Sequence, residues 1–254
     1  PQIVPEPSAL LVTGISPETL DQAEYSYYEF ATEIRNKILE WSPAIVCGYN
    51  TLSFDEHFLR SMFYQNLFPP YLTQINGNSR LDILALVRAA EYFYPGKINY
   101  PINAKGKTSK KLEDIAPANG FARHDAHDAK GDVMATVFVA RLVREIAPTL
   151  WGRAKASSSR SAFNSLIKDD EPLIIFDHNN GWPVIFPALK VGKVDNSRNT
   201  LFFDLRFDPK LINLNDAEAC FSGQSRPFRR CKDSEVPLTL SIEDYKGLSL
   251  GLDF

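Results

Sequence analysis

The chain has 254 residues, which is enough for one or two domains with sizeable hydrophobic cores. Its hydrophobic share of 44% and its charged share of 23% are ordinary for a folded globular protein and argue against wholesale disorder. The formal net charge of −3 excludes a uniformly basic, histone-like binder, so any contact with nucleic acid must come from local patches.

The sequence predicts neither a membrane span nor a secretion signal. It contains no run of about 18 apolar residues, so we expect no transmembrane helix and no membrane partner. Residues 1–7 lack the basic start and apolar stretch of a signal peptide, and they begin without Met, so we expect the chain to be a piece of a longer protein. The three cysteines share no metal-binding spacing, which predicts reduced thiols in a cytoplasmic protein.

Roughly the first 150 residues alternate between helical and strand-like patterns. Ser16 and Pro17 form a typical helix start, and apolar side chains then recur at helical spacing from Tyr27 to Trp41. Pro43 ends this amphipathic helix. The short apolar run at residues 44–49 predicts a buried strand.

Further helices are predicted downstream of this strand. Their expected ranges are from near Asp55 to Leu67, from about Arg80 to Phe93, from Ser109 to Asn119, and from about Asp128 to Ile146. Gly120 is expected to stop the third of these. The residues expected to face inward in the last helix are Val133, Val137, Ala140 and Val143.

The sequence pattern changes after a stretch of small and polar residues at 155–161. Strand-like runs then dominate, at Leu173–Phe176, Val184–Val191, Leu201–Leu205 and Val236–Ile242. Short strands with turn residues between them predict a small β-barrel or sandwich-like domain. We therefore expect an α/β domain at 1–154, a connection at 155–165 and a β domain at 166–254.

The first candidate site motif lies where the predicted strand passes into a helix. Ligands of open α/β sheets bind at the carboxyl ends of the strands, so a carboxylate such as Asp55 there can point into a cleft. Asn50, in the same turn, can present an amide to a substrate. The alternative is that Asp55 only caps the helix.

The second candidate motif enters the long helix near residue 128. His127 lies at its start, where the helix dipole favours a neutral imidazole that can act as a general base. Asp132 is a hard oxygen donor of the kind that Mg²⁺ or Mn²⁺ accepts. The alternative is a purely structural role for both side chains.

Together the two motifs resemble the second and third motifs of the His-containing Asp-Glu-Asp-Asp 3′→5′ exonucleases, and most closely the bacterial exodeoxyribonuclease I family. The segments that match in order and spacing are Leu11–Glu18, Gly48–Asn50 with Phe54-Asp55, Asn78–Asp82, Leu112–Asp114 with Ala118–Gly120, and Ala126–Ala129 with Asp132. This resemblance implies an RNase H-like exonuclease fold that lacks its N-terminal strands. It also implies a small SH3-like β domain behind that fold.

The resemblance implies a metal-dependent enzyme that removes nucleotides from the 3′ ends of single-stranded DNA in DNA repair and recombination. It assigns His127 as the base that deprotonates water, and Asp55 and Asp132 as ligands of Mg²⁺ or Mn²⁺, with two ions in the complete enzyme. The residues expected to touch DNA are Thr13, Gly14, Ile15, Asn50, Arg88 and Lys111. A basic cluster at Arg226, Arg229, Arg230 and Lys232 is a further phosphate candidate.

The family's first motif, an Asp-x-Glu on its first strand, has no counterpart in the expected order. Here this spacing occurs only at Asp169/Glu171, Asp216/Glu218 and Asp233/Glu235, all in the predicted β domain. We therefore expect a fragment that lacks the first motif and the family's C-terminal helical domain, with little activity by itself. Through that missing region the complete enzyme, a monomer, is expected to contact single-strand DNA-binding protein.

Two alternatives remain open. The first alternative to the DNA exonuclease is a catalytically inactive module that binds single strands. The second is part of an exoribonuclease of the oligoribonuclease type, which uses the same carboxylates. The missing Asp-x-Glu favours the first alternative, whereas the predicted β domain argues against the second.

Overall fold

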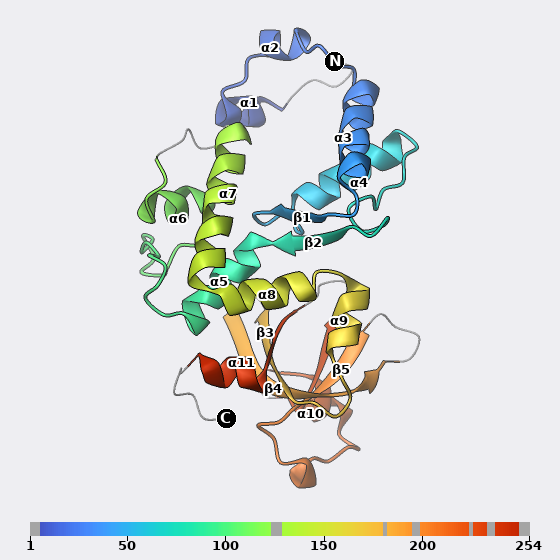
Figure 1. The fold of residues 1–254 in the computed structure, drawn as a ribbon, viewed down its shortest axis with the longest axis vertical. Coiled ribbons are helices and arrows are strands. Elements are labelled where there is room, and N and C mark those ends of the chain that lie inside the picture. The colour runs from blue at the N-terminus through green and yellow to red at the C-terminus, as the bar shows by residue number, and fades with distance from the viewer. Residues whose placement is uncertain are drawn as a thin grey trace. The chain divides into compact units, whose positions relative to one another are not determined.

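The computed structural model describes residues 6–122, 129–179, 182–194, 199–223, 226–232 and 237–248, and it divides into two compact units (Figure 1). The first unit comprises Pro1–Leu84 and Asn99–Leu142, and the second comprises Ala85–Ile98 and Val143–Phe254. The domain boundary predicted at residue 154 stays a prediction. None of the described helices is both long and apolar enough to span a bilayer.

The first unit is mainly helical around a short parallel pair of strands (Figure 1). Its elements are α1 (Pro7–Thr13), α2 (Pro17–Asp21), α3 (Tyr27–Trp41), β1 (Ile45–Gly48), α4 (Asp55–Gln65), β2 (Ser79–Asp82), α6 (Leu112–Ala118) and most of α7 (Ala129–Ile146). The predicted helix start is confirmed, because the Ser16 hydroxyl accepts a hydrogen bond from the Thr19 N–H. A capping box between Ser26 and Glu29 then starts α3 as a separate helix.

β1 and β2 are parallel and in register from Ile45 opposite Ser79 to Gly48 opposite Asp82. The predicted strand at residues 44–49 is thus confirmed, but the helix predicted from Arg80 is wrong at its start, because residues 79–82 form β2 and α5 (Ile83–Phe93) begins after them. The buried Asn78 amide fixes the entry to both strands. Its oxygen accepts from the Ala44 N–H at 2.8 Å, and its nitrogen donates to the Leu72 carbonyl at 2.8 Å.

The core of the first unit lies between α3 and α4. Its buried members are Ala31, Ile38, Met62, Phe63 and Leu72. Because α4 packs its apolar side on α3, its N-terminal turn is fixed directly after β1, which is where the first candidate motif lies.

The inward face of α7 is only partly the predicted one. Val143 is fully buried as predicted, but Val133 and Val137 are 60% and 37% exposed, and Ala135 and Val139 are fully buried in their place. Ala135 and Val139 are separated by one helical turn, as Val133 and Val137 are, but the two pairs lie on different sides of the helix. Ala135 is smaller and less hydrophobic than Val133 or Val137, so the sequence pattern favoured the side of the helix that carries the two valines.

The second unit is built on an antiparallel sheet in the order β6-β5-β4-β3-β7. Figure 1 labels β3, β4 and β5 of this sheet. Its elements are most of α5, α8 (Pro148–Ala156), α9 (Arg160–Leu166), β3 (Leu173–Asn179), β4 (Trp182–Lys193), β5 (Asn199–Asp204), the 3₁₀ turn Pro209–Leu211, α10 (Ala217–Phe221), β6 (Phe228–Lys232), β7 (Leu238–Ser241) and α11 (Ile242–Gly247). The β-rich second half is therefore confirmed. The SH3-like assignment stays a prediction.

One face of this sheet is covered by α9, whose Phe163 is fully buried in the core of the unit. β5 alternates between buried and half-exposed residues, as expected for a strand that packs one face on a core. β6 was not predicted, because its sequence contains Arg229, Arg230 and Lys232 and looks like a basic loop.

Candidate active site

The turn that follows β1 depends on a glycine. A Cβ atom on Gly48 would lie 1.6 Å from the Thr51 hydroxyl oxygen and 2.8 Å from the Thr51 Cβ. Any larger residue would push the turn away from the strand, because the Thr51 Cβ cannot move without the backbone. Gly48 thus lets the segment that carries Asn50 and Asp55 fold back tightly.

The Asp82 carboxylate, at the end of β2, holds this turn in place. Its Oδ1 accepts hydrogen bonds from the backbone N–H groups of Asn50 at 2.9 Å and Leu84 at 3.0 Å, and its Oδ2 accepts from the Leu52 N–H at 3.3 Å. Asn50 has a left-handed backbone with φ of 61°, a conformation that needs such support. Asp82 also caps α5, which begins at the next residue.

Asp82 is not among the site residues predicted from the sequence. The available signal was its position, because it follows an apolar strand residue directly and therefore lies at the carboxyl end of a strand parallel to β1. That signal required β2 to be recognised, and the helix predicted from Arg80 concealed it.

Asp55 is the first residue of α4, and its side chain is exposed. The N-cap position belongs to Phe54, so Asp55 is not the cap of the helix. Within the part of the chain that the structure describes, its carboxylate has no hydrogen bond or ion pair. An exposed carboxylate without a partner among the described residues is available to bind a cation.

The neighbouring Glu56 has a structural role instead. It is 1% exposed, and its Oε2 accepts from Arg60 at 3.1 Å and from Arg80 at 3.2 Å. Burial of the Arg80 guanidinium lowers its pKa, and the Glu56 charge opposes this shift. This buried ion pair links the first turns of α4 to β2 and so stiffens the base of the turn that presents Asp55.

Asp132 lies in the first turn of α7, and its side chain is half-buried. His127, the candidate base, lies outside the described residues, so its position relative to Asp132 and Asp55 stays a prediction. Among the residues that are described, no group of three or more His, Cys, Asp or Glu side chains is placed to hold a metal ion.

The segment that contains Thr13, Gly14 and Ile15 ends α1. The Thr13 hydroxyl donates to the Ala9 carbonyl at 2.9 Å, and Gly14 adopts a left-handed φ of 66°, which terminates the helix. Ile15 is exposed. The exposure of Ile15 leaves its side chain accessible to a ligand, and its contact with DNA stays a prediction.

The two predicted phosphate contacts have different surroundings. Arg88, on α5, is half-buried and makes no ion pair within the described ranges. Lys111 is exposed, and its Nζ donates to Glu113 Oε1 at 2.7 Å, which raises the pKa of the lysine. An exposed pair of this kind is weak, so a phosphate can compete with Glu113 for Lys111.

Arg229, predicted as a phosphate candidate, is instead part of a buried ion pair. It is 8% exposed, and its Nε donates to the fully buried Asp204 at 3.2 Å. Its guanidinium carbon lies 4.7 Å from the centroid of the Phe186 ring, and burial lowers the pKa of this arginine. Arg229 therefore holds β6 against β5, whereas Arg230 and Lys232 on the same strand are exposed.

The Asp-x-Glu pairs of the second half are used elsewhere where they are described. Asp169 pairs with Lys190, Glu171 pairs with Lys168, and the Asp216 side chain caps α10. Residues 233–235 lie outside the described residues. Asp169, Glu171 and Asp216 therefore already have partners within the second unit.

Comparison with curated proteins identifies relatives of this chain. It is 37% identical over 253 residues to Exodeoxyribonuclease I of Buchnera aphidicola subsp. Schizaphis graminum, a match that covers 98% of this chain and 49% of that protein. It is 36% identical over 149 residues to Exodeoxyribonuclease I of Escherichia coli, which covers 58% of this chain and 31% of that protein. The chain spans about half the length, or less, of the curated relatives it matches. No family model matches it.

Solved structures agree with these relatives. E. coli Exonuclease I in complex with a dT13 oligonucleotide aligns with 98% of this chain and 58% of that chain, with a TM-score of 0.75 and 26% identity. A structure of SSB/Exonuclease I with the inhibitor CFAM aligns with a TM-score of 0.73 and 26% identity, covering 97% of this chain and 57% of that chain.

A zinc-bound E. coli ExoI–ssDNA complex aligns with a TM-score of 0.74 and 25% identity, with 97% of this chain and 57% of that chain covered. The α/β fold of this chain is that of Exonuclease I, and a divalent metal is bound in one of its structural neighbours. The chain is thus a relative of the exodeoxyribonuclease I family over nearly its whole length.

Proposed function

We propose that this chain contributes the nuclease site and part of the DNA-binding surface of a metal-dependent 3′→5′ exonuclease that acts on single-stranded DNA. The observation that supports this most strongly is the turn after β1. There Asp82 fixes the backbone of Asn50 and Leu52, and Asp55 follows with an exposed, unpaired carboxylate. The relatives named exodeoxyribonuclease I supply the reaction class.

Asp55 and Asp132 are proposed to hold a divalent cation, and their chemistry fits Mg²⁺ or Mn²⁺, which prefer carboxylate oxygens. The cation, when bound, stabilises the charge that develops on the phosphate oxygens. Two carboxylates are few for two ions, so the second ion of the complete enzyme requires further oxygen donors. His127 is proposed to accept the proton of the attacking water.

The proposed contacts between this chain and DNA are few and mainly polar. Thr13, Gly14 and Ile15 are proposed to pack against the terminal bases, and the Asn50 amide is proposed to hydrogen-bond the strand. Arg88 and Lys111 are proposed to bind phosphates, which positions the strand without reading its sequence.

The finer assignments are part of the same proposal. They are an RNase H-like exonuclease domain at 1–154, a connection at 155–165 and an SH3-like domain at 166–254. The proposed enzyme acts as a monomer, and its proposed partners are single-stranded DNA and single-strand DNA-binding protein, which accompanies Exonuclease I in a structural neighbour.

A chimera tests this function directly. A segment with the Asp-x-Glu strand that the family resemblance implies is fused ahead of residue 1, and a 5′-labelled DNA strand is incubated with the chimera and Mg²⁺. We expect stepwise shortening from the 3′ end, at least about tenfold faster than with the chain alone, because the added carboxylates complete the metal site. EDTA should stop the reaction, as should a blocked 3′ end.

The other outcomes identify the alternatives. Faster digestion of an RNA strand of the same sequence would indicate an exoribonuclease of the oligoribonuclease type. Tight binding of the single strand with no hydrolysis by the chimera would indicate an inactive binding module.

A further inference from the structure

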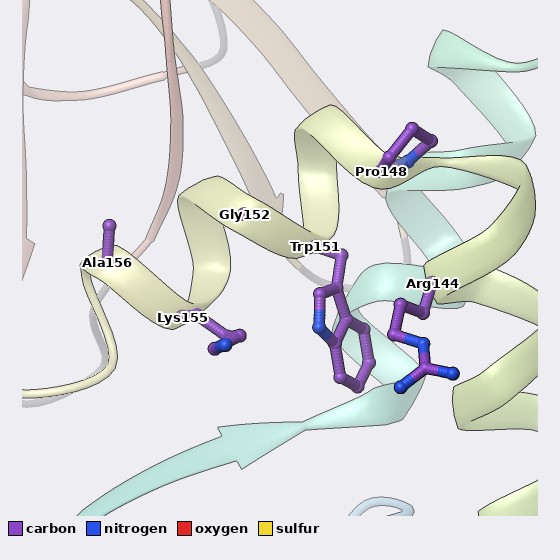
Figure 2. A pocket seen from close by; sticks show the side chains of 6 residues that line it. All are labelled: Arg144, Pro148, Trp151, Gly152, Lys155 and Ala156. Atoms are coloured by element: carbon purple, nitrogen blue, oxygen red, sulfur yellow. The ribbon is translucent and has the colours of Figure 1, made fainter.

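The second unit carries a groove beside α8 whose walls are aromatic and cationic. It has a volume of about 430 Å³ and is open to solvent, and it is lined by Arg144, Pro148, Trp151, Gly152, Lys155 and Ala156. In Figure 2 the side chains of Trp151 and Lys155 project from α8, and the Arg144 side chain, from the end of α7, lies beside the indole. The glycine and the alanine leave the space around the indole open.

The two cationic side chains of this groove are not neutralised by acidic side chains of the described residues. Arg144 and Lys155 are exposed, and neither makes an ion pair or hydrogen bond through its side chain in the described ranges of the chain. Many other cations of the second unit are paired, among them Arg153 with Asp244 and Arg206 with Asp204. In a chain of net charge −3, two unpaired cations beside one aromatic ring form a local site for an anion.

We propose that this Trp151 groove binds one nucleotide of a single DNA strand, with the base stacked on the indole and the flanking phosphates held by Arg144 and Lys155. The proposal rests on the proposed function, because it adds a contact to the same single-stranded substrate. None of the groove residues belongs to the candidate catalytic set, so the groove contributes affinity and not chemistry.

The shape and chemistry of the groove favour a nucleotide. The groove is open to solvent, and its volume of about 430 Å³ leaves room for one base beside the indole. An indole face accepts any base, and a guanidinium matches the oxygens of a phosphate in pairs. Cations on both sides of one ring suit a ligand with a phosphate on each side of each base, which is the repeat of a single strand.

The test measures binding of a fluorescent oligo(dT) to the 254-residue chain by anisotropy. We expect Trp151→Ala to weaken binding by about 5- to 100-fold, the usual effect of removing one stacking ring. Trp151→Phe should restore most of the affinity. The pair Arg144→Gln and Lys155→Gln should reduce the slope of log K against log salt by about 1.4, since each phosphate contact on a single strand contributes about 0.7.

The matched control replaces Lys210 and Lys246 by Gln, two exposed lysines of the same unit, and it should leave the slope unchanged. If circular dichroism shows that Trp151→Ala is unstable, the test rests on the double variant Arg144→Gln and Lys155→Gln. Both of these side chains are exposed, so their replacement should not disturb the packing of the unit. If the unmodified chain binds oligo(dT) tightly and the Trp151, Arg144 and Lys155 variants bind it equally well, the proposal that the groove binds a nucleotide is wrong. That result would not contradict the proposed function.

A peptide of Asp and Phe residues serves as the second probe. If the Trp151 variants lost this peptide while they kept oligo(dT), the groove would be a peptide site and the proposal would be wrong. No binding of oligo(dT) by the unmodified chain would overturn the proposed function itself and the groove with it.

Discussion

Replacing His127 with alanine is expected to slow hydrolysis by the active chimera about 10²- to 10⁴-fold, the usual range for the loss of a general base. The reason is chemical, because water attacks a phosphodiester efficiently only when a neighbouring group accepts its proton. Affinity for the single strand should change little, since the imidazole is proposed to touch the attacking water and not the backbone. Single-turnover digestion and anisotropy measure the two quantities separately.

The pH profile provides the control for His127. With the histidine present, the rate should rise with pH as the imidazole loses its proton, because only the neutral imidazole accepts a proton. His127→Gln should remove this rise while it retains a polar side chain. A parallel loss of DNA affinity and rate in both variants, with the pH profile unchanged, would assign His127 a structural role.

Replacing Asp82 with alanine is expected to lower the free energy of unfolding by about 2–4 kcal/mol, because three backbone N–H groups lose a charged acceptor. It should also slow the chimera about 10- to 100-fold, the usual cost of losing a group that orients a metal ligand. The turn that carries Asn50 and Asp55 would no longer be fixed to β2. Denaturant unfolding and single-turnover rates measure these effects.

Asp82→Asn keeps the shape of the side chain but removes its negative charge. The asparagine oxygen still accepts from Asn50 and Leu84, whereas its nitrogen faces the Leu52 N–H, so its effects should be smaller than those of alanine. Asp170→Ala, at an exposed position with no described ion pair, is the matched control and should be neutral. Equal effects of Asp82→Ala and Asp170→Ala would show that Asp82 does not hold the turn.

The parts of the site that depend on local signals could be predicted from the sequence. The apolar run before Gly48 predicted β1, and the apolar periodicity of residues 58–67 predicted α4, so Asp55 falls at the strand-to-helix turn as expected. The same holds for the start of α2 at Ser16, where the side chain caps the helix. In each case neighbouring residues determine the structure.

The parts that depend on distant partners could not be predicted in this way. Residues 79–82 form a strand only because β1 lies beside them, although the apolar residues that follow favour a helix. Arg229 looks like a surface cation until β5 brings the buried Asp204 against it. The choice between two apolar stripes on α7 likewise depends on which side packs, since both have helical spacing.

Salt titration of binding tests the single-strand assignment most directly, with a fluorescent single strand and its duplex measured side by side on this chain. The proposed contacts are those of Arg88, Lys111, Arg144 and Lys155, and four contacts predict a slope of log K against log salt of about −3 on the single strand. The single strand should bind more tightly than the duplex, because stacking on side chains requires unpaired bases. A flat salt response, or tighter binding of the duplex, would contradict the assignment.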